Sequence, residues 1–163
     1  MKFLNIALIE PEIPQNTGNI SRTCACTGIA LHLVKPMGFE INDKQLKRAG
    51  LDYWNMLDVT IYESLEEFNE KTKDFPHYYV TTKGKSNYDK VCYEENCFIV
   101  FGKETKGLPE KLLYENYDRC IRIPMVKSAR SLNLSNSVAI VAYEALRQND
   151  FADLLLEGHL TEY

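Results

Sequence analysis

The 163-residue sequence contains no long apolar run: nowhere do the roughly 20 consecutive apolar residues of a membrane span occur. We therefore expect no membrane partner. The start of the chain, residues 1–9, is short and soon followed by Glu10 and Glu12, so it predicts a first strand rather than a secretion signal. The composition, 45% hydrophobic and 26% charged, is that of a soluble globular protein. We expect one domain over residues 1–163, located in the cytoplasm.

Metal-binding and disulfide signatures are also missing. The five cysteines form no C-x-x-C pair, and the three histidines are far apart in the sequence. These residues are Cys24, Cys26, Cys92, Cys97, Cys120, His32, His77 and His159. We expect reduced structural thiols and no metal.

Three common enzyme signatures are absent as well. The loop 101–109 carries Gly102 and Gly107 around Glu104 but lacks the Gly-Lys-Ser/Thr of a P-loop, and no G-x-G-x-x-G occurs. No G-x-S-x-G occurs either, which argues against a serine hydrolase. Two interpretations of Glu104 remain: its carboxylate binds a ribose hydroxyl or a cationic ligand, or it forms an ordinary salt bridge within the loop.

The formal net charge of −4 argues against a protein that coats nucleic acid indiscriminately. A local basic face remains, because the spacing of Lys44, Lys47 and Arg48 places all three on one side of a predicted helix. The alternative is a solvated helix face without a ligand.

Apolar, β-rich runs alternate with helical patterns along the chain. Six strands are predicted, at Phe3–Ile9, Ala30–Val34, Leu57–Tyr62, His77–Thr81, Cys97–Phe101 and Arg119–Ile123. Helices are predicted near Thr17–Thr27, Asp43–Tyr53, Ser64–Lys73 and Pro109–Glu115, the third opened by a Ser64–Glu67 capping box. This alternation predicts an α/β fold with a mostly parallel sheet covered by helices on both faces.

A last helical pattern begins near Leu134. Its apolar stripe contains Leu134, Val138, Val141, Ala142 and Ala145. Because Ala139, Ile140 and Leu146 widen this stripe, the helix is predicted either to pack on its own sheet or to contribute to a dimer interface.

Polar residues gather where strands end, which is where α/β proteins hold ligands. After the first strand, Asn16 is predicted to cap the following helix, with Arg22 nearly two turns further on as a phosphate ligand or a surface arginine. In the last third, Ile121, Ile123 and Leu132 offer an apolar wall beside the polar run Ser131–Ser137, an arrangement that suits adenine.

Three motifs, Asn16-x-Gly18-x-x-x-Arg22, Phe101-Gly-x-Glu104-x-x-Gly107 and Ile123-Pro followed by Ser131-Leu-Asn133, resemble in this order those of the SPOUT, or trefoil-knotted, RNA methyltransferases. The resemblance covers essentially the whole chain. The segments 10–20, 35–39 and 48–53 are similar to the minimal members of the family, which methylate the ribose 2′-oxygen of the wobble nucleotide of tRNA and lack a separate RNA-binding domain.

The resemblance implies a C-terminal deep trefoil knot, a homodimer, and S-adenosylmethionine as methyl donor, with S-adenosylhomocysteine as product. Carried over by motif, the expected cofactor-binding residues are Val80, Thr81, Gly102, Glu104, Gly107, Ile121, Ile123, Ser131, Leu132 and Asn133. The expected reaction site consists of Arg22, Asn16, Ser131 and Asn133. Arg22 is expected to act toward a cofactor held by the other subunit, so that monomers are inactive.

The implied reaction is 2′-O-methylation of cytidine or modified uridine at position 34, in the anticodon loop of tRNA. The expected RNA-binding residues are Arg22, Lys44, Lys47, Arg48, Lys83, Lys127, Arg130 and Tyr143. The resemblance leaves open methylation of another tRNA position or of ribosomal RNA. It also leaves open a non-catalytic RNA binder regulated by the cofactor.

Overall fold

The computed structural model describes residues 4–41 and 56–162. Its elements are β1 (Leu4–Ile9), α1 (Pro14–Thr27), β2 (Ala30–Val34), β3 (Val59–Tyr62), α3 (Leu65–Thr72), β4 (His77–Val80), β5 (Ser86–Asn87), β6 (Cys97–Phe101), α4 (Glu110–Glu115), the 3-10 turn η2 (Tyr117–Arg119), β7 (Cys120–Arg122) and α5 (Leu134–Gln148). The expected helix at 43–53 lies outside the described residues.

The strands form one seven-stranded sheet in the order β3-β2-β1-β6-β4-β7-β5, and all their pairings are parallel. The α/β class with a parallel sheet is thus confirmed. Sequence analysis missed β5, whose two residues are too short a run to show an alternating pattern.

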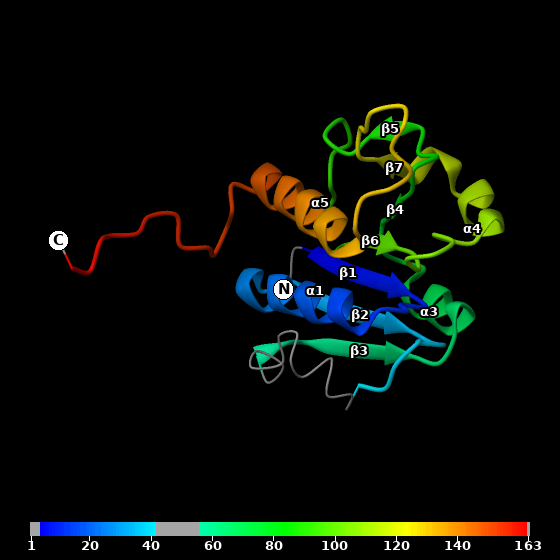
Figure 1. Cartoon of the computed structure of the whole chain (residues 1–163), viewed down its shortest axis with the longest axis horizontal. Helices are drawn as coiled ribbons and strands as arrows, with labels where there is room; N and C mark the ends of the chain where they lie inside the picture. The colour runs from blue at the N-terminus through cyan, green and yellow to red at the C-terminus, as the bar shows by residue number, and fades with distance from the viewer. Residues whose placement is uncertain (1–3, 42–55, 163) are drawn as a thin grey trace.

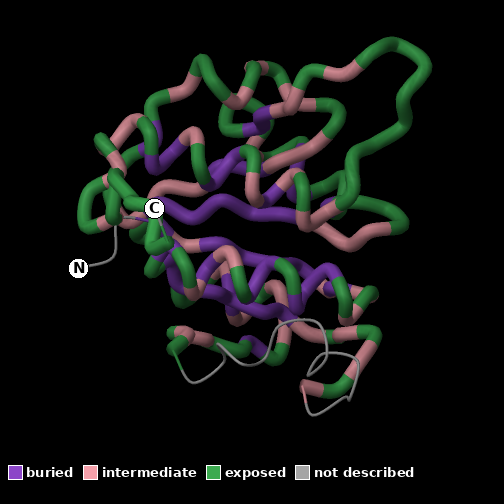
Figure 2. The backbone as a smooth tube through the Cα atoms, turned by 60° about the vertical axis from the view of Figure 1, so that its left-hand side comes forward, coloured by how far each residue is buried: buried purple, intermediate pink, exposed green. Residues whose placement is uncertain are grey.

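Both faces of the sheet are buried, as a parallel sheet requires. Along β1, Ile6 and Leu8 belong to the core beneath α1 and α5, whereas Ala7 and Ile9 belong to the core beneath α3 and α4. Figure 1 shows α1 and α5 side by side, and Figure 2 shows the buried strands running through the centre of the molecule.

The predicted apolar stripe of α5 faces the protein interior. Val138, Val141, Ala142 and Ala145 are fully buried, while Ile140 on the outer side is 37% exposed. The helix therefore packs on its own sheet and still presents apolar surface to the outside. No helix of the described chain is long and apolar enough to cross a membrane.

The start of α1 differs from expectation. Its N-cap is Ile13, which has no side-chain capping bond, and the helix begins at Pro14 in a first-turn position. The prediction that Asn16 caps this helix is therefore wrong, because proline fixes the helical backbone earlier in the chain. The predicted capping bond of α3 is confirmed, since Ser64 Oγ accepts a hydrogen bond from the Glu67 amide at 3.2 Å.

Candidate active site at the carboxyl ends of the central strands

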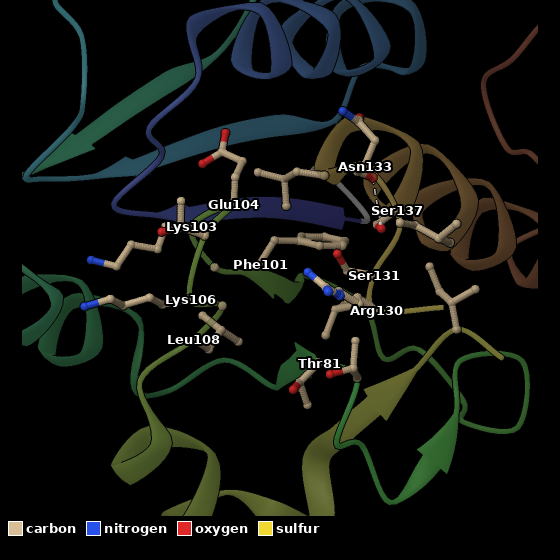
Figure 3. Close-up of a pocket in the computed structure, with 18 of the residues that line it drawn as sticks. Thr81, Phe101, Lys103, Glu104, Lys106, Leu108, Arg130, Ser131, Asn133 and Ser137 are labelled. Atoms are coloured by element: carbon tan, nitrogen blue, oxygen red, sulfur yellow. Dashed lines mark hydrogen bonds between the residues drawn. The ribbon is translucent and has the colours of Figure 1, made fainter. Parts of the chain in front are cut away.

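A pocket of about 560 Å³ lies where β4, β6 and β7 end, which is within the size range of cofactor sites. Its walls come from segments far apart in the sequence: the start of α1, the loops after β4 and β6, and the chain from the end of β7 to the start of α5. Figure 3 shows these side chains around the cavity. Parallel strands place their carboxyl ends at one edge of the sheet, which explains why these loops meet.

Most of the predicted site residues line this pocket. They are Asn16, Val80, Thr81, Lys83, Gly102, Glu104, Gly107, Ile123, Arg130, Ser131, Leu132 and Asn133. Three motifs that are separated by tens of residues thus form a single site.

Other predicted residues lie elsewhere. Ile121 is fully buried in the core, and only its carbonyl oxygen, which accepts from the Thr81 amide at 2.9 Å, supports the pocket wall. Arg22 on α1, Lys127 and Tyr143 on α5 are exposed and do not line the pocket. The predicted RNA-binding residues Lys44, Lys47 and Arg48 lie outside the described residues.

The Glu104 carboxylate points to α1. Its Oε2 accepts from the backbone amide of Glu12 at 2.8 Å, and its Oε1 accepts from the amide of Ile13 and from Asn16 Nδ2, both at 3.1 Å. These bonds provide the capping that α1 lacks in its own sequence, and α1 has no acidic residue in its first turn. Both oxygens of Glu104 are thus engaged within the protein, so the structure does not support an ordinary loop salt bridge.

Asn16 and Asn133 are bonded to each other across the pocket edge. Asn133 Nδ2 donates to Asn16 Oδ1 at 3.0 Å. The other end of the same amide, Asn133 Oδ1, caps α5 by accepting from the amides of Ser135 at 2.9 Å and Asn136 at 3.3 Å. Asn133 is therefore the N-cap of α5.

The loop after β6 is folded tightly against itself. The amide of Gly107 donates to the carbonyl of Lys103 at 2.9 Å, and Gly107 has a left-handed φ of 71°. A Cβ on Gly102 would lie 2.3 Å from the backbone nitrogen of Leu108, so only glycine fits there. The two glycines of this loop are therefore required by its shape.

The lysines beside Glu104 differ in their surroundings. Lys103 Nζ donates to Glu10, and this hydrogen bond raises the pKa of Lys103 above its ordinary value. Lys106 is exposed at the pocket wall. The first lysine therefore ties the loop to the end of β1, and the second is open to solvent.

Two polar groups at the pocket are available to a ligand. Within the described part of the chain, neither the Arg130 guanidinium nor the Ser131 hydroxyl has a hydrogen-bond partner, and both side chains lie at the cavity in Figure 3. Apolar surface is provided by Val80, Leu108 and Ile123. The site thus combines an apolar wall with donors for a polar or anionic group.

Some pocket residues were not predicted. Met125 and Ser137 line the cavity, and Ser137 Oγ donates to the Asn133 carbonyl at 3.1 Å (Figure 3). The serine lies one turn after the cap, a spacing that could have identified it. Met125 has no signal in the sequence. Among the described residues, no group of three or more His, Cys, Asp or Glu side chains is placed to hold a metal ion.

Comparisons with known proteins agree with this architecture. Residues 3–143 match the model of the SpoU rRNA Methylase family. A protein of Listeria innocua, a candidate tRNA (cytidine(34)-2′-O)-methyltransferase, is 55% identical over 94% of this chain and 92% of its own length.

Solved structures are similar as well. One, reported for the 2-OH methylation of C/U34 on tRNA, has a TM-score of 0.86 and 39% identity, covering 90% of this chain and 96% of its own. Another, an AdoMet-bound rRNA methyltransferase of Sinorhizobium meliloti, has a TM-score of 0.80 and 25% identity, covering 88% of this chain and 56% of its own. The fold is that of the SPOUT methyltransferases, with their C-terminal knot, as the sequence motifs predicted. The chain belongs to the SpoU rRNA Methylase family.

Proposed function

We propose that this protein transfers a methyl group from S-adenosylmethionine to the ribose 2′-oxygen of the wobble nucleotide, cytidine or modified uridine 34, of tRNA. The observation that carries the proposal is the convergence of the three motifs on one pocket. The choice of substrate is supported by relatives of more than half identity that are named for cytidine 34.

The residues present fit the cofactor. Val80, Leu108 and Ile123 provide apolar contacts for the adenine ring of the cofactor, and the Ser131 hydroxyl is available for its polar groups. A Cβ on Gly107 would meet nothing within 4 Å, so its bare backbone leaves room for close approach of a ligand. When bound, S-adenosylmethionine supplies an electrophilic methyl group on a sulfonium.

The chain's own contribution is mainly to position the reacting groups. Arg22 cannot serve as a general base, because a guanidinium stays protonated in proteins. Arg22 instead binds the phosphate beside the target ribose or stabilises the developing negative charge on the 2′-oxygen. That phosphate or Ser131 relays the hydroxyl proton to solvent; Ser131 gives up its own hydroxyl proton as it takes up that of the ribose.

We further propose a homodimer that joins through the outer side of α1 and α5. Ile140 and Tyr143 are 37% and 48% exposed on this side. Because Arg22 is an exposed residue of α1 that does not line its own pocket, it acts on a cofactor held by the other subunit. A monomer is then inactive.

The RNA partner is the anticodon loop in the cytoplasm, where unstacked bases and the 2′-hydroxyl are accessible. Lys83 and Arg130 at the pocket, and Lys127 outside it, bind its phosphates. Tyr143 offers a stacking surface. Lys44, Lys47 and Arg48, which lie outside the described residues, are part of the same proposal as RNA-binding residues. To bind a phosphate, Lys83 must give up its ion pair with Glu110. This pair is weak, because the Glu110 side chain is 75% exposed.

The test is transfer of labelled methyl groups from S-adenosylmethionine to total tRNA from a strain that lacks this protein. Mass spectrometry then locates the modified nucleotide. A 2′-O-methyl group at position 34 is the expected result. Label at another position of tRNA would contradict the substrate and retain the enzyme class. Cofactor binding without any transfer would favour a non-catalytic RNA binder.

A further inference from the structure

One feature that the proposed reaction does not use is the direction of the hydrogen bonds between Glu104, Asn16 and Asn133. An ionised carboxylate only accepts hydrogen bonds, whereas an amide side chain has a donor end and an acceptor end. The orientation of each amide is therefore set by its neighbour. The chain of bonds begins at Glu104 Oε1, which accepts from Asn16 Nδ2 at 3.1 Å.

The next two bonds follow from the first. Because Asn16 Nδ2 faces Glu104, its Oδ1 faces Asn133, and Asn133 must present Nδ2, which it does at 3.0 Å. Asn133 Oδ1 is then left to cap α5, with Ser135 N at 2.9 Å and Ser135 Oγ at 2.6 Å. The two asparagines lie 117 residues apart.

We propose that Glu104, Asn16 and Asn133 form a directional hydrogen-bond relay in which the charge of Glu104 orients both amides and so fixes the start of α5 and the Ser131–Asn133 wall of the pocket. These are positioning residues. The relay connects three parts of the site: the loop after β6, the helix that carries Arg22, and the helix that follows the third motif. Its role in methyl transfer rests on the proposed function, but its existence does not.

The low exposure of the central residue supports a relay rather than a chance contact. Asn16 is 5% exposed, so an unpaired amide end there would lack water to replace its partner. Glu104 is also held by the Glu12 and Ile13 amides, which keep its carboxylate at the start of α1. The bonds to an ionised group are the stronger ones, so the direction is imposed from the Glu104 end.

The variant Glu104→Gln tests this direction. Glutamine offers one acceptor oxygen to the three donors that Glu104 now accepts. With its NH₂ group in the Oε1 place it faces the Asn16 donor; Asn16 and Asn133 must then both flip, which turns the Asn133 NH₂ group toward the amides of α5. We expect exchange of the Ser135 and Asn136 amide protons, measured by NMR on the free protein, to become about tenfold faster, the equivalent of one lost hydrogen bond. Affinity for S-adenosylhomocysteine, measured by calorimetry, is expected to fall about tenfold or more.

The double variant Glu104→Gln with Asn16→Asp should restore the direction. The NH₂ group of the introduced glutamine donates to the new carboxylate, whose other oxygen again accepts from Asn133. Slow exchange of the Ser135 and Asn136 amides and part of the cofactor affinity should return. The rescue is partial, because the Ile13 amide loses the acceptor that it now shares with Asn16.

Asn16→Asp alone provides a second test if Glu104→Gln does not fold. It sets two carboxylates against each other, and such pairs share one proton when the pH is lowered. We expect its affinity for S-adenosylhomocysteine to be weak at pH 8 and to improve toward pH 6, relative to the unsubstituted protein.

The control is Glu12→Gln, because Glu12 Oε2 holds the same loop through the Thr105 amide and hydroxyl but its side chain is outside the relay. This variant should leave the Ser135 and Asn136 exchange rates unchanged. The proposal is overturned if Asn16→Asp shows no loss of affinity for S-adenosylhomocysteine at pH 8, or if adding Asn16→Asp to Glu104→Gln fails to reverse the effect of Glu104→Gln. A relay that behaves as expected in a protein without methyltransferase activity would instead overturn only the proposed function.

Discussion

Replacement of Gly102 by alanine tests whether the pocket depends on the fold of the loop after β6. The added Cβ would lie 2.3 Å from the nitrogen of Leu108, 2.5 Å from the carbonyl carbon of Gly107 and 2.8 Å from Cα of Leu108. All three are backbone atoms, so no side-chain rotation relieves the contacts. Reaching an ordinary separation requires the 107–108 backbone to move by about 1 Å, at a typical overpacking cost of about 1–3 kcal/mol.

Because Gly102, Gly107 and Leu108 all line the pocket, we expect this displacement to change the cavity. If this free energy is lost only when the ligand binds, the affinity for S-adenosylhomocysteine drops by roughly 5- to 150-fold, which calorimetry can measure. The Tm of the same samples shows how much of this free energy is instead lost from the stability of the folded protein. Gly158→Ala is the control, since a Cβ there meets nothing within 4 Å. Affinity and Tm both equal to those of the control would refute the reasoning.

Three further predictions address catalysis, stability and assembly. Arg22→Lys should lower the rate of methyl transfer about 100-fold and leave cofactor affinity the same, because lysine lacks the bidentate fork of the guanidinium. Unchanged turnover with intact RNA binding would exclude the proposed role. Burial lowers the pKa of His77, so the unfolded chain takes up a proton first as the pH falls below about 6.5, and Tm should decrease there more in the unsubstituted protein than in His77→Gln; parallel Tm profiles would contradict this. Ile140→Glu should give monomers in sedimentation and loss of activity, whereas Val126→Glu, at an exposed apolar residue outside α1 and α5, should remain dimeric; a dimeric Ile140→Glu would exclude this interface.

Local patterns in the sequence predicted most of the elements correctly. The strands β2 and β6 have the predicted bounds. β6 is a continuous apolar run and β2 is apolar except for His32, as is typical of strands buried on both faces. The stripe of α5 is confirmed for the same reason, since a helical period of apolar residues requires a buried side. The two-residue β5 could not be predicted, because its pairing with β7 comes from the tertiary structure and not from its own residues.

The functional site was predicted through motifs rather than through periodicity. Most of the motif residues line the pocket. The motifs alone do not show which of these residues face the cavity and which support its wall from behind; the tertiary structure does. Ile121 was predicted as part of the apolar wall but is fully buried, because it lies within β7. Ile123 points to the same face two residues later but lies beyond the end of the strand, where it lines the pocket.

The sequence alone determined the parallel α/β class, the segments that carry the chemistry, and the family resemblance, since these depend on residue type and spacing along the chain. Only the tertiary structure decided what Glu104 and Asn16 do. Glu104 accepts from the amide of Ile13, the N-cap residue of α1, which lies 91 residues earlier in the chain. Asn16 bonds to Asn133 instead of capping its own helix. A hydrogen bond depends on distances of about 3 Å and on the direction of donor and acceptor, which are set by how the loops meet at the edge of the sheet.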